Sequence, residues 1–345
     1  MADANGRLVV YLTVVLTALV IVLVVLTTLA RAWRRSRERR RHEADLIARP
    51  LILAALDGDL PESPVQVSSQ VGRYLDSMAV GMAGKLRGAD RSALADLLGR
   101  RGTVAAARRR TRSQLSGRRL RAVELLGSLG VAEAVPDLVA RLGDPDEEVR
   151  RVAVRALGRT AAPEAVPALL ALLDAPRQAE SAHYITLALL RIGPAGTSRL
   201  ADAVHTHGPR GREAAAQVLG WLGETSAVGA LEQALQDDDA RVRSAAVEAL
   251  GRIGLPTAAP AMCLLLGPEQ PEAVRITAAT ALGRLGDPGS SEPLRGLLAE
   301  SHTLARAAAT ALSQLGPAGL TMLREESSVP ESHEVLSALT EEVMA

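Results

Sequence analysis

Phenylalanine is absent from this chain, and aromatic residues make up only 1 % of its 345 residues. Large globular cores normally take much of their bulk from aromatic side chains, so a single compact globule of this length is disfavoured. Leucine, valine and alanine must then fill the interior, and side chains of that size fill it best when thin helices stack closely. A chain of this length is ordinary for an array of stacked repeats.

Cysteine and lysine are almost as scarce. Cys263 is the only cysteine, so the chain can form no intramolecular disulfide and gives no sign of an oxidising compartment. Lys85 is the only lysine, and arginine carries nearly all the positive charge behind a net charge of +1. The last 21 residues contain no lysine or arginine but hold six glutamates: Glu325, Glu326, Glu331, Glu334, Glu341 and Glu342.

Residues 8–30 form a long stretch without charge. As a helix of 23 residues it would measure about 34 Å at about 1.5 Å per residue, enough to cross a bilayer. Residues 31–42, the basic collar, hold seven arginines, whereas residues 1–7 hold only Asp3 and Arg7 as charged side chains. Because positive flanks stay in the cytoplasm, the pattern predicts one transmembrane helix with a short outer N-terminus and a cytoplasmic remainder.

A cleaved signal peptide is the alternative for this stretch. The basic residues follow the stretch instead of preceding it, and the run is too long for a signal peptide, so we favour an uncleaved anchor in the cell membrane. Arginines close to anionic headgroups contribute about 1 kcal/mol each. Those expected to contact the membrane surface are Arg34, Arg35, Arg37, Arg39, Arg40 and Arg41.

A short phrase recurs between residues 118 and 323: leucine, then glycine or a substitute, then often a second glycine three positions on. Its anchor positions are Gly127, Gly158, Arg191, Gly220, Gly251, Gly283 and Ser313, separated by steps of 31, 33, 29, 31, 32 and 30. Self-similarity at such a period is typical of a solenoid. Each unit is predicted to be a helix pair, with Gly158 ending the first helix of its unit and Pro136, Pro167 and Pro260 in the first turn of second helices.

An arginine stands eight residues before the anchor in five of the seven units. We interpret it as structural, reaching an acid or a free carbonyl of the neighbouring unit, with Asp144, Asp146, Asp238 and Asp239 as candidate partners. The five arginines are Arg119, Arg150, Arg212, Arg243 and Arg275.

Two segments, DPDEEVRRVAVRALGRTAAPEAVPALLALLD and DDDARVRSAAVEALGRIGLPTAAPAMCLLL, resemble HEAT repeats of the short bacterial kind, often labelled phycobilisome-lyase-type HEAT-like repeats. The resemblance covers residues 118–323 and implies an all-α fold, an α-solenoid of about seven helix pairs. It also implies that the second helices line a concave face that holds another protein. Residues 43–117 are expected to be divergent helices capping the array, with a loop near residues 60–69, and residues 324–345 an acidic C-terminal helix or tail.

Motifs for catalysis or metal binding are not evident. The pairs His42-Glu43 and His333-Glu334 lie outside well-formed repeats, and His205 and His207 do not share a helix face. Cys263 stands in an apolar run and fits a small core residue. No P-loop or G-x-S-x-G elbow occurs. We expect neither a metal, a cofactor nor enzymatic activity, although a lyase or chromophore-binding enzyme of the HEAT-like group remains an alternative.

A second basic cluster holds nine arginines between Arg100 and Arg121. It is open to four interpretations: a solvated helical face, lipid contact, an acidic protein partner, or nucleic acid, which is disfavoured because no aromatic side chains are interleaved. The candidate protein-binding surface is the outward side of the second helices, with small and weakly polar residues. Its members are Asp137, Arg141, Ala168, Ala171, His205 and Gln233, with Ala230 and Ala261 at equivalent positions.

The sequence thus predicts a membrane-anchored cytoplasmic scaffold or adaptor. Its partners are expected to be another protein, itself membrane-associated, and anionic lipid headgroups at the basic collar. An anchor of this kind raises the effective concentration of the array toward proteins in the same bilayer.

Overall fold

The computed structural model describes the backbone of residues 2–59, 67–175 and 182–344, and side chains within these ranges except those of residues 2–22, 30, 37, 40 and 339–344. Every regular element in these ranges is a helix. The chain divides into two compact units, Met1–Ala106 and Ala107–Ala345. Most of the loop expected near residues 60–69 lies outside the described ranges.

The first unit is built on one long helix, α1 (Ala2–Leu56), against which α2 (Ser69–Ala83) and α3 (Gly88–Arg100) pack. The C-terminal part of α1 buries Ala44, Ala48, Ile52 and Ala55, a spacing of three and four residues that places them on one helix face. The partners contribute a leucine and alanine core as well: Leu75, Ala79, Leu94, Leu97 and Leu98. The predicted helical character of this region is confirmed, and α4 (Thr103–Arg110) follows it.

The predicted membrane span, residues 8–30, falls on α1. The side chains of residues 8–22 and of Ala30 lie outside the described part. In the described part, no helix is both long enough and apolar enough to cross a membrane.

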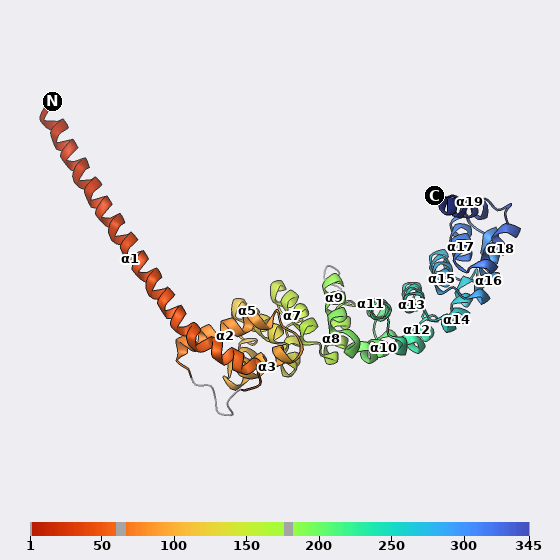
Figure 1. The fold of residues 1–345 in the computed structure, drawn as a ribbon, viewed down its shortest axis with the longest axis horizontal. Coiled ribbons are helices and arrows are strands. Elements are labelled where there is room, and N and C mark those ends of the chain that lie inside the picture. The colour runs from red at the N-terminus through yellow and green to blue at the C-terminus, as the bar shows by residue number, and fades with distance from the viewer. Residues whose placement is uncertain (1, 60–66, 176–181, 345) are drawn as a thin grey trace. The chain divides into compact units, whose positions relative to one another are not determined.

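In its described residues, the second unit is an array of seven helix pairs, as the repeat predicted. Long first helices pack on one another in succession, and shorter second helices follow them on the other side of the array (Figure 1). The first helices are α5 (Ser116–Leu129), α7 (Glu147–Thr160), α9 (Ala182–Ile192), α11 (Pro209–Leu222), α13 (Ala240–Ile253), α15 (Glu272–Leu285) and α17 (His302–Gln314). The second helices are α6 (Val135–Val139), α8 (Val166–Ala171), α10 (Thr197–Thr206), α12 (Val228–Ala234), α14 (Ala259–Cys263), α16 (Ser291–Arg295) and α18 (Pro317–Glu325).

A further helix, α19 (Pro330–Met344), packs against α17 and α18. It confirms the helix expected in the acidic C-terminal segment. Pro136, Pro167 and Pro260 stand at the first or second position of α6, α8 and α14, where a missing N–H removes no helical hydrogen bond.

The anchor glycines have a different role from the one predicted. Gly158 does not end α7, which runs to Thr160. A Cβ built on Gly158 would lie 2.7 Å from the Cα of Ala188 in the next first helix, and one on Gly220 would lie 2.5 Å from the Cα of Ala249. The anchor glycine therefore lets two first helices touch backbone to backbone, which explains how a core without phenylalanine is closely packed.

The second glycine of the phrase is the one that ends the helix. Gly130, Gly223, Gly254 and Gly286 follow α5, α11, α13 and α15 with φ between +66° and +78°, the left-handed conformation that a C-terminal cap requires. In the second pair this place is taken by Ala161, whose φ is +53°. Alanine is strained in that conformation because its Cβ approaches the following carbonyl.

Ala161→Gly is therefore expected to stabilise the protein by about 0.5–1 kcal/mol, the relief of left-handed strain less the added entropy of an unfolded glycine. Thermal and urea unfolding of the purified variant measure the change. Ala140→Gly is the matched control, because Ala140 is exposed and has a φ of −60°. Destabilisation of both variants alike would contradict the assignment of strain to Ala161.

Candidate functional site

Three of the five repeated arginines form two-point ion pairs with an acid 25 residues further along the chain. Arg119 donates from Nε and Nη2 to the carboxylate of Asp144, at 2.8 and 2.7 Å. Arg212 pairs in the same way with Asp237, at 2.7 and 2.8 Å, and Arg275 pairs with Glu300. These three contacts fit the structural interpretation of the repeated arginines, but Asp237 and Glu300 were not among the expected partners.

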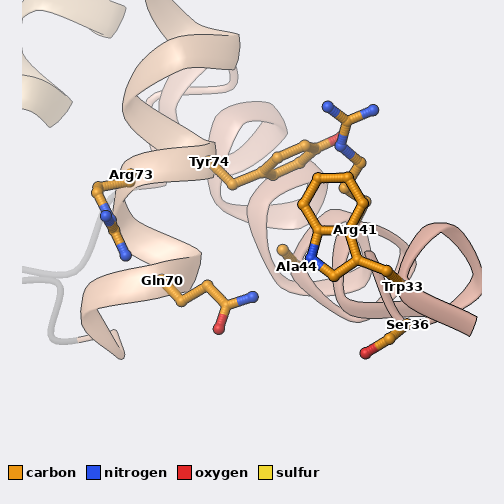
Figure 2. A pocket seen from close by; sticks show the side chains of 7 residues that line it. All are labelled: Trp33, Ser36, Arg41, Ala44, Gln70, Arg73 and Tyr74. Carbon is orange, nitrogen blue, oxygen red and sulfur yellow. The ribbon is translucent and has the colours of Figure 1, made fainter. Parts of the chain in front are cut away.

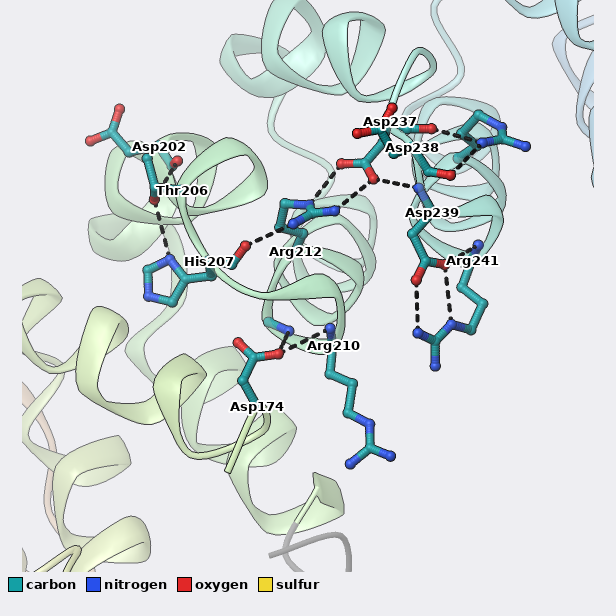
Figure 3. Close-up of polar contacts among 12 residues, drawn as sticks. Asp174, Asp202, Thr206, His207, Arg210, Arg212, Asp237, Asp238, Asp239 and Arg241 are labelled. Carbon is teal, nitrogen blue, oxygen red and sulfur yellow. Dashed lines mark hydrogen bonds and ion pairs between the residues drawn. The ribbon is translucent and has the colours of Figure 1, made fainter. Parts of the chain in front are cut away.

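The acid also fixes the start of the next first helix. Asp237 accepts the amide of Asp239 at 2.9 Å, and Asp239 caps α13 by accepting the amide of Arg241. Figure 3 shows this chain of contacts, in which Arg212 also donates to the carbonyl of His207. The arginine thus links its own helix, the preceding loop and the following pair.

The same contacts set the pKa values of the acids. Burial raises the pKa of Asp144, but hydrogen bonds from Arg119 and the Asp146 amide, with the charges of Arg119 and Arg141, outweigh it and hold that pKa below its ordinary value. Hydrogen bonds from the side chain and amide of Arg241 lower the pKa of Asp239 to about 2. Both carboxylates are therefore charged at neutral pH and serve as fixed anions of the framework.

Arg150 and Arg243 differ from the other three, because the position 25 residues further on holds Ala175 or Pro268. Arg150 donates to the carbonyls of Asp144 and Pro145, at 2.7 and 3.2 Å. Arg243 donates to the carbonyls of Asp237 and Asp238, at 2.7 and 3.1 Å, and its buried Nε has no hydrogen-bond partner. These two arginines thus bind carbonyls of the loop before their own helix, and neither reaches an acid or a carbonyl of the neighbouring unit as predicted.

The candidate surface on the second helices is only partly as expected. Ala171, His205 and Gln233 are exposed, whereas Ala168, Ala230 and Ala261 are half-buried. Leu264 stands 13 residues after Gly251, as Ala171 does after Gly158 and Gln233 after Gly220. Its side chain is 73 % exposed, so a large apolar residue belongs to this row, although Leu264 was not among the predicted members. That the second helices line a concave face stays a prediction.

Asp137 does not face outward, contrary to the prediction. Its side chain is 7 % exposed and accepts from Arg108 Nε at 2.6 Å and from Arg112 Nη2 at 3.3 Å. Arg141 is half-buried and pairs with Asp144 at 3.3 Å. Both residues are thus held in ion pairs of the array and are not open for a partner.

The second basic cluster is divided by these contacts. Arg108, Arg112 and Arg119 bind the acids of the first two pairs. Four other members of the cluster, Arg109, Arg110, Arg118 and Arg121, are exposed on helices, which fits the solvated face. Of the basic collar, Arg34, Arg35, Arg39 and Arg41 are exposed on α1, and Arg37 and Arg40 lie outside the described side chains.

Metal-binding groups do not gather in the described ranges, where no three His, Cys, Asp or Glu side chains are placed to hold an ion. Cys263 is half-buried, and its thiol lies 3.7 Å from Ser290 Oγ. Burial raises the pKa of this thiol, and a protonated thiol is a weak nucleophile.

Comparisons with known proteins identify the array. Residues 116–189 and 197–272 match the family of HEAT repeats, which agrees with the helical solenoid of the second unit. No curated protein matches the sequence.

Solved structures agree with this fold. A crystal structure of a Kap121p mutant is 15 % identical with a TM-score of 0.51, over 84 % of this chain and 36 % of its own. Human deoxyhypusine hydroxylase is 21 % identical with a TM-score of 0.33, over 81 % of this chain and 98 % of its own. The complex of CpcE and CpcF of phycocyanin lyase from Nostoc sp. PCC7120 is 22 % identical with a TM-score of 0.27, over 81 % of this chain and 97 % of its own. Identities this low concern the fold alone, and of these three structures only the Kap121p mutant, with a TM-score above 0.5, supports it.

Proposed function

We propose that this protein is a membrane-anchored, non-enzymatic scaffold that holds another protein on the exposed side of its second helices. Residues 8–30 anchor it in the cell membrane, with the N-terminus outside and the HEAT array in the cytoplasm. Its partner is a protein associated with the same membrane. The proposal needs no cofactor and no nucleic acid.

The row of exposed second-helix residues carries the protein-binding part of the proposal. Solenoids of repeats use an extended face that several units build together. Here one repeat position is occupied by Ala171 on α8, Gln233 on α12 and Leu264 in the turn after α14. All three side chains are uncharged and exposed, unlike those of Asp137 and Arg141. A repeat position that holds an alanine, an uncharged amide and an exposed leucine suits an amphipathic helix or an extended segment better than a charged polymer.

The membrane part rests on α1. This helix runs without a break from the apolar stretch through the basic collar into the first unit. The side chains described near the end of the stretch are exposed although they are apolar: Leu23 is 61 % exposed, Leu26 58 % and Leu29 61 %. Such a surface is costly in water and favourable in a hydrocarbon layer.

Topology is tested with a reporter enzyme that works only outside the cytoplasm, fused after Ala345. We expect no activity, because the arginines of the collar hold that flank in the cytoplasm. Fusion of the same reporter before Met1 is the positive control. Activity at the C-terminal end, with the fusion protein intact, would overturn both the orientation and the cytoplasmic scaffold.

Binding is tested by adding charge to the second-helix row. Ala171→Arg with Gln233→Arg is expected to reduce partner capture at least tenfold, because two guanidinium groups would have to be desolvated in the interface. Capture is measured by affinity purification from detergent with quantitative mass spectrometry. Far-UV circular dichroism and the unfolding temperature should not change, since both side chains are exposed.

The matched control is Thr280→Arg with Thr310→Arg, which adds the same charge at exposed positions of the first helices α15 and α17. Equal loss of capture in both double variants would indicate a charge effect and contradict the second-helix site. Loss only when Arg109 and Arg110 are neutralised would move the site to the basic cluster. A covalently bound chromophore, seen as absorbance beyond the ultraviolet, would favour the lyase alternative.

A further inference from the structure

A cavity of about 470 Å³ lies in the first unit, between α1 and α2. Four of its lining side chains come from α1 and three from α2, and Figure 2 shows them around the opening. Ala44 is the smallest of them. The sequence gives no sign of this cavity, because its two sides are contributed by residues about 30 positions apart.

The lining is cationic. It includes Arg41 of α1 and Arg73 of α2 but no carboxylate. Neither guanidinium forms an ion pair with a carboxylate in the described ranges, and Arg73 Nε donates only to the carbonyl of Ser69, at 3.2 Å. The side chains of Ser36 and Gln70 add uncharged hydrogen-bonding groups. Guanidinium forks with neutral donors beside them suit an anion with several oxygens, above all a phosphate.

Asp45, which hydrogen-bonds to the lining residue Tyr74, does not cancel this charge. Asp45 accepts from Arg49 Nε at 2.7 Å and from the hydroxyl of Tyr74 at 3.1 Å. The hydrogen bond from Arg49, with that from Tyr74, holds the pKa of Asp45 below its ordinary value despite partial burial. Asp45 is therefore already neutralised by Arg49, and it turns the hydroxyl of Tyr74 toward itself.

The cavity lies just beyond the apolar stretch. Trp33, one of the lining residues, is 63 % exposed and follows Leu29 by four residues, a rise of about 6 Å along a helix. An indole at this place suits the level of lipid headgroups. Its apolar face would border the first carbons of an acyl chain, while Arg41 and Arg73 face the phosphate.

We propose that this cavity binds the phosphodiester of an anionic glycerophospholipid, with Arg41 and Arg73 as its phosphate ligands. The site rests on the proposed placement of α1 in a membrane and adds a particular lipid to it. A zwitterionic lipid is disfavoured, because its choline group would bring a second positive charge to the two guanidinium groups. A soluble phosphate compound would use the same groups but not Trp33.

The test uses the full chain in detergent, incubated with equal amounts of phosphatidylglycerol and phosphatidylcholine and examined by native mass spectrometry. We expect one phosphatidylglycerol to be retained, at least tenfold in preference to phosphatidylcholine. Arg41→Ala with Arg73→Ala should lower its retention at least tenfold. Arg35→Ala with Arg39→Ala is the matched control, since it removes the same charge from exposed positions of α1 outside the cavity lining, and it should retain the lipid.

Other outcomes overturn the proposal. Equal loss in both double variants means diffuse attraction to the basic collar, and equal retention of the two lipids means no headgroup site. If millimolar glycerol 3-phosphate displaces the lipid and binds as tightly as the lipid does, the cavity belongs to a soluble ligand. Arg73→Lys, which keeps the charge but loses the fork, should give intermediate retention and guards against misfolding of the alanine variant. Failure of the chain to enter liposomes at all would refute the anchor itself, whereas entry without lipid preference refutes only the cavity.

Discussion

Gly220→Ala is expected to destabilise the array by about 3 kcal/mol, near the upper end for overpacking a core. The new Cβ would lie 2.5 Å from the Cα of Ala249 and 2.7 Å from its Cβ. Backbone cannot yield to this contact as a flexible side chain could, so α11 and α13 would have to separate along their shared length. Urea unfolding of the purified protein measures the loss.

Gly229→Ala is the matched control in the second helix of the same pair. No atom lies within 4 Å of a Cβ at that position, so alanine should gain about 0.5–1 kcal/mol from its higher helix propensity. Opposite signs for two Gly→Ala changes nine residues apart would assign the cost at Gly220 to contact between helices. Destabilisation at both positions would refute that assignment.

A second-site change separates backbone contact from side-chain contact. At Gly251 the nearest atom to a new Cβ is the Cβ of Ala281, at 2.8 Å, and its Cα is at 3.3 Å. Ala281→Gly should therefore recover part of the stability lost in Gly251→Ala. Ala249→Gly should recover little of the loss in Gly220→Ala, where the backbone itself is the obstacle.

The period of the repeat predicted the architecture because each unit repeats the same helix pair. The positions of leucine, alanine and proline predicted the two helices of each pair, and the described ranges hold seven pairs. The sequence could not tell which glycine of the phrase caps the helix and which touches the next one. Both glycines are small, and only the arrangement of α7 against α9 shows that Gly158 lies at a helix contact.

Contacts between side chains were harder to predict than helices. Asp137 lies at a position that is exposed in an isolated second helix, but Arg108 and Arg112 from the preceding helix and loop cover it. Leu264 stands in an apolar run beside Cys263, yet α14 is followed by a tight turn that leaves Leu264 exposed. The surroundings of both Asp137 and Leu264 depend on neighbouring elements, whose positions the pattern of a single helix does not contain.

The partners of the repeated arginines were also hard to predict from the sequence. Their spacing predicted a structural role, and the 25-residue distance to Asp144, Asp237 and Glu300 could have identified the acids. The sequence conceals this distance because the acid is absent in two of the five units, after Arg150 and Arg243. A repeat in which some units keep an ion pair and others lose it should have units of unequal stability.

Asp144→Ala is therefore expected to cost about 3–5 kcal/mol, the usual loss when one partner of a buried ion pair is removed. The side chain of Asp144 is 0 % exposed, and its loss leaves the guanidinium of Arg119 and the amide of Asp146 without their acceptor. Arg150→Ala should cost only about 1 kcal/mol, since it breaks hydrogen bonds to carbonyls that water can replace. Denaturant unfolding of both variants measures the difference.

Asp146→Ala is the control for the helix cap, because Asp146 accepts the amides of Glu148 and Val149 at the start of α7 but pairs with no arginine of the preceding helix. It should cost about 1 kcal/mol.

The pH dependence of unfolding gives a second measure of the ion pair. The pKa of Asp144 is lowered on folding, so the contribution of its carboxylate to the free energy of unfolding is complete above about pH 4 and is lost as the pH falls through the folded pKa. The difference in free energy of unfolding between wild type and Asp144→Ala should therefore narrow below pH 4. Two results would mean that the ion pair does not hold the first two helix pairs together. One is a difference that does not change below pH 4, and the other is a difference at neutral pH no larger than that caused by Asp146→Ala.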